Sequence, residues 1–281
     1  MAYKSIFTVA TNAALVPMSV ASAARIAEAN DAHLDILALG VDRTQVGYSY
    51  VGSGAALMQV ALERAEADAR ELEKAAKAAI AAENLDLRAG TEAAVAQMGA
   101  VADLIATRAR FADLVVLPRP YGKDQGPEAE AVVEAAMFEG QAPVLVLPGK
   151  ELASPSPKCV VIAWNQSREA MAAVRKALPF LKSADLVDIT VVDPPNHGPE
   201  RSDPGGMLCQ MLVRHGVRAE VSVLAKTLPR VSDVLARHVR DRNADMLVMG
   251  AYGHSRFREA ILGGATRNML EQAEVPVLMA H

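Results

Sequence analysis

Glycines near the end of the chain have a spacing that could bind a phosphate group. Gly250 and Gly253 follow a short apolar run, and the pair Gly263-Gly264 precedes a helical pattern over 266–272. Glycine lets backbone N–H groups approach a ligand closely because no Cβ intervenes. A helix N-terminus adds N–H donors and a partial positive charge. The stretch therefore predicts a phosphate site, and the alternative is a plain strand–loop–helix connection whose glycines serve tight turns.

Strands alternate with helices along the whole chain, and this order must position the glycines. The apolar runs predict strands at 5–10, 34–39, 85–89, 113–117, 144–147, 159–163, 186–192, 219–224, 246–249 and 277–279. Helical spacing predicts helices at 19–30, 55–83, 98–110, 128–139, 168–181, 207–215, 231–240 and 266–272. Because most of the strands are apolar throughout, we expect an α/β fold with parallel sheets and helices on both faces.

The two halves of the chain are an internal repeat. The matched segments are ADLVVL at 112–117 with ADMLVM at 244–249, and APVLVL at 142–147 with VPVLMA at 275–280. Residues 149–157 have the composition of a linker. We therefore expect two domains, 1–150 and 156–281.

Each half ends in an apolar strand that begins with a proline. A proline cannot donate to a strand ladder, so it belongs at a sheet edge or at the first residue of a strand. Two exposed apolar edges would promote aggregation unless they cover each other. We therefore expect the halves to form an intramolecular pseudo-dimer through 143–147 and 276–280.

Composition limits the classes of function. The net charge is −4 with scattered basic residues, which disfavours nucleic acid as a partner. Two cysteines without a CxxC or His/Cys cluster indicate neither a disulfide framework nor a zinc site. Residues 1–20 have no sustained apolar core, and no uncharged segment is long enough to span a bilayer. We therefore expect a cytoplasmic protein that neither associates with a membrane nor holds a metal ion.

The glycine spacing, its flanking strand and helix, and the closing Val-Pro-Val strand resemble the universal stress protein family in its tandem two-domain form. The most specific part is Gly250-x2-Gly253-x9-Gly263. The resemblance covers nearly the whole chain. It implies two doubly wound domains, each a five-stranded parallel sheet of order 3-2-1-4-5, with ATP bound where strands 1 and 4 diverge. That place agrees with the general rule that open α/β sheets bind ligands at a topological switch point.

The resemblance also implies a set of nucleotide-binding residues. Those on the adenine and ribose side are Ala163, Asn165 and Val192. Those along the ribose and phosphates are Met249, Gly250 and Gly253. The N–H donors to the phosphates are Gly263, Gly264 and Ala265.

Two of these positions depart from the family pattern. Asn165 stands where the family usually has Asp, and an amide bonds a ribose hydroxyl without the strength of a charge-assisted hydrogen bond. Gly264 stands where the family has Ser or Thr, so one hydroxyl donor is missing. Thr266 follows two residues later as a candidate substitute.

The first half departs further from the pattern. Pro118 stands at the position of Gly250 and lacks an N–H. Tyr121 stands at the position of Gly253, and Asn12 at the position of Asn165. We interpret this half as a largely structural copy that binds no nucleotide.

Several other side chains have competing interpretations. His254, Arg256 and Arg258 could steer phosphates or form a solvated loop face. Trp164 could stack on a base, but core packing is favoured. For His238 the favoured interpretation is a surface position, because the sequence gives it no paired carboxylate.

Three functions remain open at the level of sequence. The favoured one is a stress-response or regulatory ATP-binding protein that acts through conformation and partners, with Mg²⁺ as an optional companion of the nucleotide. The alternative is an enzyme, such as a slow nucleotide hydrolase or nucleotidyl transferase. It is disfavoured because the glycine stretch has no Walker lysine, metal cluster or evident general base. The third is a dimerising scaffold without a ligand. Further homo-oligomerisation is an expectation by family analogy alone.

Overall fold

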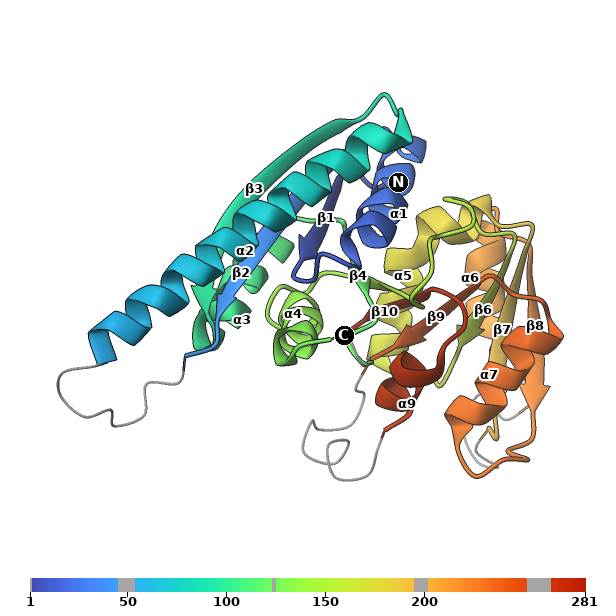
Figure 1. Ribbon diagram of the computed structural model, residues 1–281. Helices are drawn as coiled ribbons and strands as arrows, with labels where there is room; N and C mark the ends of the chain where they lie inside the picture. The colour runs from blue at the N-terminus through green and yellow to red at the C-terminus, as the bar shows by residue number, and fades with distance from the viewer. Residues whose placement is uncertain (1, 45–53, 123–124, 195–201, 252–263) are drawn as a thin grey trace. The chain divides into compact units, whose positions relative to one another are not determined.

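The computed structural model describes residues 2–44, 54–122, 125–194, 202–251 and 264–281. The chain forms two compact units (Figure 1). One unit consists of residues 3–142 with 149–151, and the other mainly of residues 143–148 with 152–281.

The first unit is a parallel sheet with the strand order β3-β2-β1-β4. Its strands are β1 (Ser5–Ala10), β2 (His33–Asp42), β3 (Arg88–Gln97) and β4 (Leu114–Pro118). Its helices are α1 (Val16–Ala29), α2 (Gly54–Glu83), α3 (Val101–Ala109) and α4 (Pro127–Met137), and a 3₁₀ turn, Met98–Ala100, precedes α3.

The second unit has the strand order β5-β10-β9-β6-β7-β8. Its strands are β5 (Val144–Leu147), β6 (Cys159–Ala163), β7 (Leu186–Val192), β8 (Ala219–Leu224), β9 (Met246–Gly250) and β10 (Val277–Ala280). Its helices are α5 (Arg168–Ser183), α6 (Gly206–Arg214), α7 (Val231–Asp241) and α9 (Ala265–Gln272). The strands from β6 onward therefore follow the order 3-2-1-4-5 that the sequence predicts.

Helices cover both faces of each sheet. In the first unit α1 packs against α2, and α3 packs against α4. Right-handed crossovers put these two pairs on opposite faces, because the chain moves outward from β1 to β3 and then returns to β4. In the second unit α7 packs against α9, and α5 packs on β9 and β10. Among the described helices, none is both long and apolar enough for a bilayer crossing.

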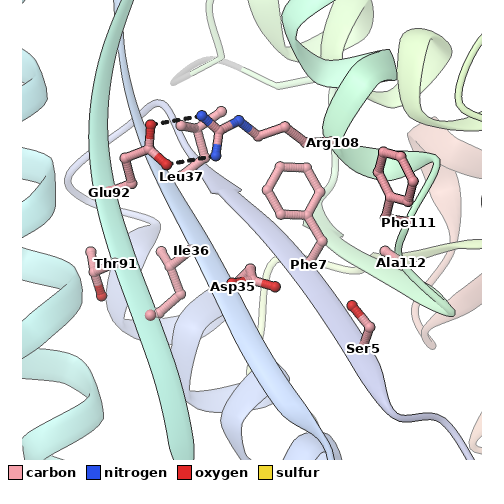
Figure 2. A pocket seen from close by; sticks show the side chains of 11 residues that line it. Ser5, Phe7, Asp35, Ile36, Leu37, Thr91, Glu92, Arg108, Phe111 and Ala112 are labelled. Atoms are coloured by element: carbon pink, nitrogen blue, oxygen red, sulfur yellow. Dashed lines mark hydrogen bonds and ion pairs between the residues drawn. The ribbon is translucent and has the colours of Figure 1, made fainter.

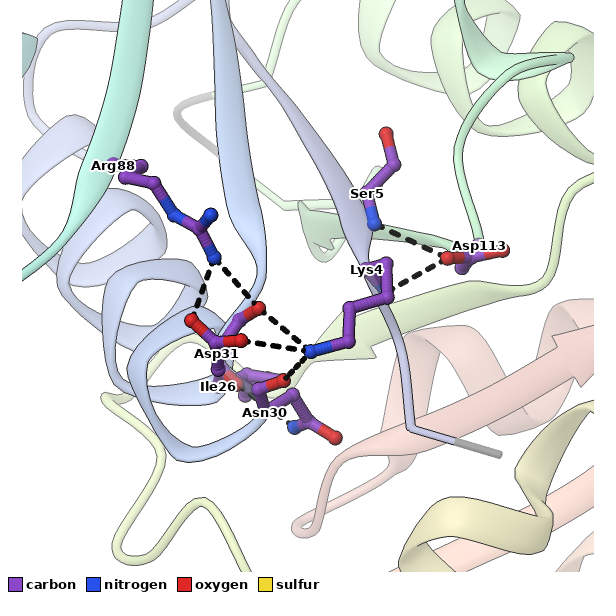
Figure 3. A network of polar contacts seen from close by, with 7 residues as sticks. All are labelled: Lys4, Ser5, Ile26, Asn30, Asp31, Arg88 and Asp113. Carbon is purple, nitrogen blue, oxygen red and sulfur yellow. Dashed lines mark hydrogen bonds and ion pairs between the residues drawn. The ribbon is translucent and has the colours of Figure 1, made fainter.

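Matching aspartates mark the repeat at the start of the first strand of each half. Asp113 Oδ2 accepts from the backbone N–H groups of Lys4 at 2.7 Å and Ser5 at 3.1 Å (Figure 3). Asp245 accepts in the same way from Lys158 at 2.8 Å and Cys159 at 3.0 Å. Ser5 and Cys159 therefore occupy equivalent positions, and this fixes the alignment of the two halves.

The two closing strands pair with each other. β5 runs antiparallel to β10, with Leu145 opposite its equivalent Leu278 and Val146 opposite Val277. All four residues of each strand are buried. Each strand thus covers an apolar edge of the other, as the proline-headed strands predict, and the pseudo-dimer as a whole stays a prediction.

The third strand of the first half differs from its predicted position. The sequence predicts a short strand at 85–89, whereas β3 covers Arg88–Gln97 and pairs with β2 along its full length. Ala, Gly and Glu dominate this strand and have low intrinsic strand preference. Pairing with the apolar β2 overrides that preference.

Candidate functional site

The ends of three parallel strands bring together four of the predicted site residues, Ala163, Val192, Met249 and Gly250. Ala163 ends β6 and pairs with Met249 of β9 on one side and with Thr190 of β7 on the other. Val192 ends β7, opposite Leu224 of β8. β6 and β9 are the first and fourth strands of this half, so the residues lie at the topological switch point where such sheets bind ligands.

Gly250 ends β9 directly against the first turn of α5. A Cβ at this position would lie 2.7 Å from the carbonyl carbon of Glu169 and 2.9 Å from Cα of Ala170, and closer still to the Ala170 nitrogen. These are backbone atoms that cannot rotate away. Glycine is therefore required here for close packing of strand and helix, whether or not a ligand binds.

Asn165 follows β6 and is exposed. Its Oδ1 accepts from the backbone N–H of Ser167 at 3.1 Å, and the Ser167 hydroxyl oxygen in turn accepts from Ala170 N–H at the start of α5. In the alignment fixed by the sheet, Asn165 corresponds to Thr11 and not, as the sequence predicts, to Asn12; Asn12 lies one residue further on and accepts from Ala14 N–H at 2.9 Å. Both asparagines thus shape the turn into the following helix. The amide nitrogen of Asn165 has no partner among the described residues, so it can donate to a ligand.

α9 begins at Ala265, with Gly264 as its N-cap. Within the described chain no side chain caps this helix, and its first turn contains no acidic residue. The helix dipole at this end is therefore not offset by a carboxylate from the first turn. Thr266 is buried. Gly253 and Gly263 lie outside the described residues, as do His254, Arg256 and Arg258.

Trp164 follows Ala163 and is buried. Its backbone N–H donates to Thr190 O at 2.9 Å. Its indole Nε1 is buried and has no hydrogen-bond partner in the described part of the chain. The side chain lies in the core of the second unit, which favours packing over stacking on a base.

The equivalent place in the first unit is occupied by an internal ion pair. A cavity of ≈ 280 Å³ lies there, bordered by Asn12 after β1, Arg43 after β2 and Glu128 in α4. The Glu128 side chain is only 4% exposed, and its Oε1 lies 2.5 Å from Arg43 Nη2. Its Cδ would lie 2.6 Å from a Cβ at Gly126, the N-cap of α4. A carboxylate of the protein thus fills the N-terminus of α4.

A buried polar cluster in the second unit corrects the surface interpretation of His238. Asp188 lies in the middle of β7 and is 0% exposed. His238 Nε2 of α7 lies 3.0 Å from Asp188 Oδ2, and the hydroxyls of Thr190 and Ser222 donate to the Asp188 carboxylate at 3.0 and 2.9 Å. His238 has a paired carboxylate, but it lies fifty residues away in the sequence. Sequence proximity therefore could not reveal the pair.

Arg242 completes this cluster from the C-cap of α7. Its Nε lies 3.0 Å from Asp188 Oδ2 as an ion pair without hydrogen-bond geometry, and its Nη2 pairs with Glu220 of β8. The signal that the sequence did offer was Asp188 itself, because a carboxylate inside an apolar strand needs buried partners.

Cys159 lies near this cluster and is not suited to act as a nucleophile. Burial raises the pKa of its thiol, against a lowering influence of Arg242. The reactive form of cysteine is the thiolate. Within the described residues, no group of three His, Cys, Asp or Glu side chains is placed to hold a metal ion.

Comparison with known proteins places the second half in a family. Residues 158–281 match the family model of the universal stress protein family. Universal stress protein Slr1230 of Synechocystis is 30% identical over 124 residues, which cover 42% of this chain and 41% of that relative.

Two solved structures are similar over nearly the whole chain. A universal stress protein from Archaeoglobus fulgidus has a TM-score of 0.69 at 15% identity, covering 98% of this chain and 95% of its own. A functionally unknown protein from Pseudomonas aeruginosa has a TM-score of 0.55 at 15% identity, covering 99% and 92%. At this identity the likeness concerns the fold, and it extends to both halves. Residues 158–281 are thus identified as a universal stress protein domain, and the chain spans less than half the length of the curated relative it matches.

Proposed function

We propose that the chain is a regulatory protein that binds one ATP in its second half and acts through conformation and partners rather than catalysis. The observation that carries the proposal is the uncapped N-terminus of α9, in the half of the chain where β6 and β9 form the switch point of the sheet. No side chain within the described residues caps this helix, and no carboxylate lies in its first turn. An anionic phosphate is the natural ligand of such a helix end.

The described residues fit a nucleotide in two further respects. Met249 and Ala163 pair at adjacent strand ends, and Val192 ends the neighbouring strand, which together provide an apolar edge for a base and ribose. The amide nitrogen of exposed Asn165 can donate to a ribose hydroxyl. Gly253 and Gly263 belong to the proposed site through the family resemblance.

The first half is not expected to bind a nucleotide, because carboxylates lie at the helix N-terminus that corresponds to the uncapped one of α9. The first turn of α4 carries Glu128 and Glu130, and Pro127 removes an N–H from its first position. Arg43 already neutralises Glu128. A phosphate would have to displace this pair and face a second carboxylate.

Calorimetric titration with ATP is therefore expected to give one site per chain. Gly253→Val should abolish binding, because a branched Cβ would enter the phosphate space. The matched change at the equivalent position, Tyr121→Val, should leave affinity within the error of the titration. Two sites per chain would mean that the first half also binds ATP. One site that survives Gly253→Val would mean that ATP does not bind at the glycine stretch of the second half.

Gly264→Ser is expected to tighten ATP binding. The serine would supply the hydroxyl that the family pattern has at this position, and one hydrogen bond to a charged group contributes about 1.5–3 kcal/mol. That corresponds to an affinity gain of roughly tenfold or more. Serine is also a favourable N-cap. Unchanged or weaker affinity in the same titration would mean that the backbone already satisfies the phosphate.

A turnover assay separates the proposed function from the enzymatic alternative. The protein is incubated with ATP in the presence of Mg²⁺, and the release of ADP, AMP or phosphate is followed over many equivalents. We expect retention of intact ATP. Sustained release that disappears in Gly253→Val would instead identify a slow hydrolase or nucleotidyl transferase.

A further inference from the structure

A cavity of the first unit lies between the sheet and the end of α3 (Figure 2). Its volume is ≈ 440 Å³, which is within the range of small-molecule sites. Phe7 of β1 and Leu37 of β2 form an apolar floor, Asp35 and Glu92 contribute carboxylates, and Arg108 and Phe111 border it from α3 and the residues that follow.

The same place in the second unit is filled by the buried polar cluster. Asp35 lies opposite Phe7 in the sheet, and Asp188 lies opposite Val161, the equivalent of Phe7. The two aspartates are therefore equivalent. Asp188 is fully buried and contacts an imidazole, a guanidinium and two hydroxyls. The Asp35 side chain is 56% exposed, and its partner is His33 at 3.3 Å.

Three differences in sequence explain why the cavity is open. Ala106, four residues before the C-cap of α3, replaces His238, four residues before the C-cap of α7. The C-cap Arg110 points elsewhere, since its Nη2 donates to Glu139 O at 3.4 Å. Gly90, opposite Asp35 in β3, replaces Glu220, which lies opposite Asp188 in β8.

The charges around the cavity favour a cation. Arg108 binds Glu92 through two hydrogen bonds of 2.6 Å, and these bonds lower the pKa of the Glu92 carboxyl, so that pair is internally neutralised. Asp35 then leaves a net negative charge on the lining. The C-terminal end of α3 adds the negative pole of a helix dipole.

We propose that this cavity binds a small planar organic cation that donates N–H hydrogen bonds to Asp35, such as an amidinium, guanidinium or imidazolium attached to an aromatic ring. The second unit supplies the template, because imidazole and guanidinium groups contact Asp188 there. Phe111, a residue that is 78% exposed, and Phe7 provide aromatic surface for the ring and for the charge. This site is separate from the proposed nucleotide site and does not depend on it.

Benzamidine is the probe for a direct test by calorimetry on the full chain. We expect saturable binding at one site per chain, with the neutral isostere benzamide at least tenfold weaker. Asp35→Asn should weaken benzamidine binding at least tenfold. Gly90→Val should also weaken it at least tenfold by filling the space, and it should fold normally because a Cβ at Gly90 meets its nearest atoms at 3.5 Å.

Asp86→Asn is the matched control, because it removes one exposed carboxylate of the same unit that does not line the cavity. Its affinity for benzamidine should equal that of the unmodified protein. The proposal is overturned if the unmodified protein shows no saturable binding, if Asp35→Asn or Gly90→Val binds as well as the unmodified protein, or if Asp86→Asn weakens binding as much as Asp35→Asn. Circular dichroism confirms that each variant is folded.

Discussion

Asp188→Ala is expected to lower the free energy of unfolding of the second unit by about 3–5 kcal/mol, the range found when one partner of a buried ion pair is removed. The change leaves His238 and the hydroxyls of Thr190 and Ser222 without their acceptor. Among the described residues, Arg242 then retains Glu220 as its one carboxylate partner. Urea denaturation followed by tryptophan fluorescence measures the effect, because Trp164 is the only tryptophan in the chain and lies in this unit.

The equivalent change in the first unit is the control. Asp35→Ala removes the same side chain from the same sheet position, but that side chain is half exposed and borders a cavity. Its effect should stay within about 0.5 kcal/mol, as for most surface substitutions, and is measured by circular dichroism. If both variants lost the same free energy of unfolding, the buried contacts of Asp188 would add nothing to stability beyond the effect of replacing an aspartate at this position of the strand.

Gly250→Ala is expected to destabilise the second unit by about 3 kcal/mol, the upper part of the range for overpacking. The added Cβ would overlap the backbone of Glu169 and Ala170, and this overlap can be relieved only by moving β9 away from α5. Because the proposed ATP site lies at this junction, ATP binding should be lost as well. Trp164 fluorescence and calorimetry report the two effects separately.

Gly99→Ala makes the same chemical change where space is open. A Cβ at Gly99 would meet no atom within 4 Å. We expect unchanged stability and unchanged ATP affinity in this variant. If Gly250→Ala were equally well tolerated, glycine would not be required at position 250 for the packing of β9 on α5.

Much of the fold could be predicted because the central strands are continuous apolar runs. β4 and β9 lie within one residue of their predicted positions, and so do β5, β7 and β8. Two strands depart further: β2 runs three residues beyond its predicted end, to Asp42, and β3 covers Arg88–Gln97. β3 is polar and alanine-rich, and its extent is set by pairing with β2 rather than by its own residues. Local preference says little about such a strand.

The candidate site could be predicted only where backbone geometry determines it. The ends of β6, β7 and β9 meet as the strand order requires, so Ala163, Val192 and Met249 gather at one edge. The packing role of Gly250 was not predictable, because it depends on how closely α5 approaches. The cluster around Asp188 joins residues from β7, β8 and α7, which no local pattern connects.

The antiparallel pair of β5 and β10 has a consequence for biosynthesis. Val146 leaves the ribosome long before its partner Val277, so the edge of β5 that β10 covers must wait for most of the second half to be synthesised. Contacts between such distant segments form slowly, and an exposed apolar edge can meanwhile pair with another chain. Nascent chains released early, before β10, are therefore the species in which this protein is most exposed to aggregation and most in need of a chaperone.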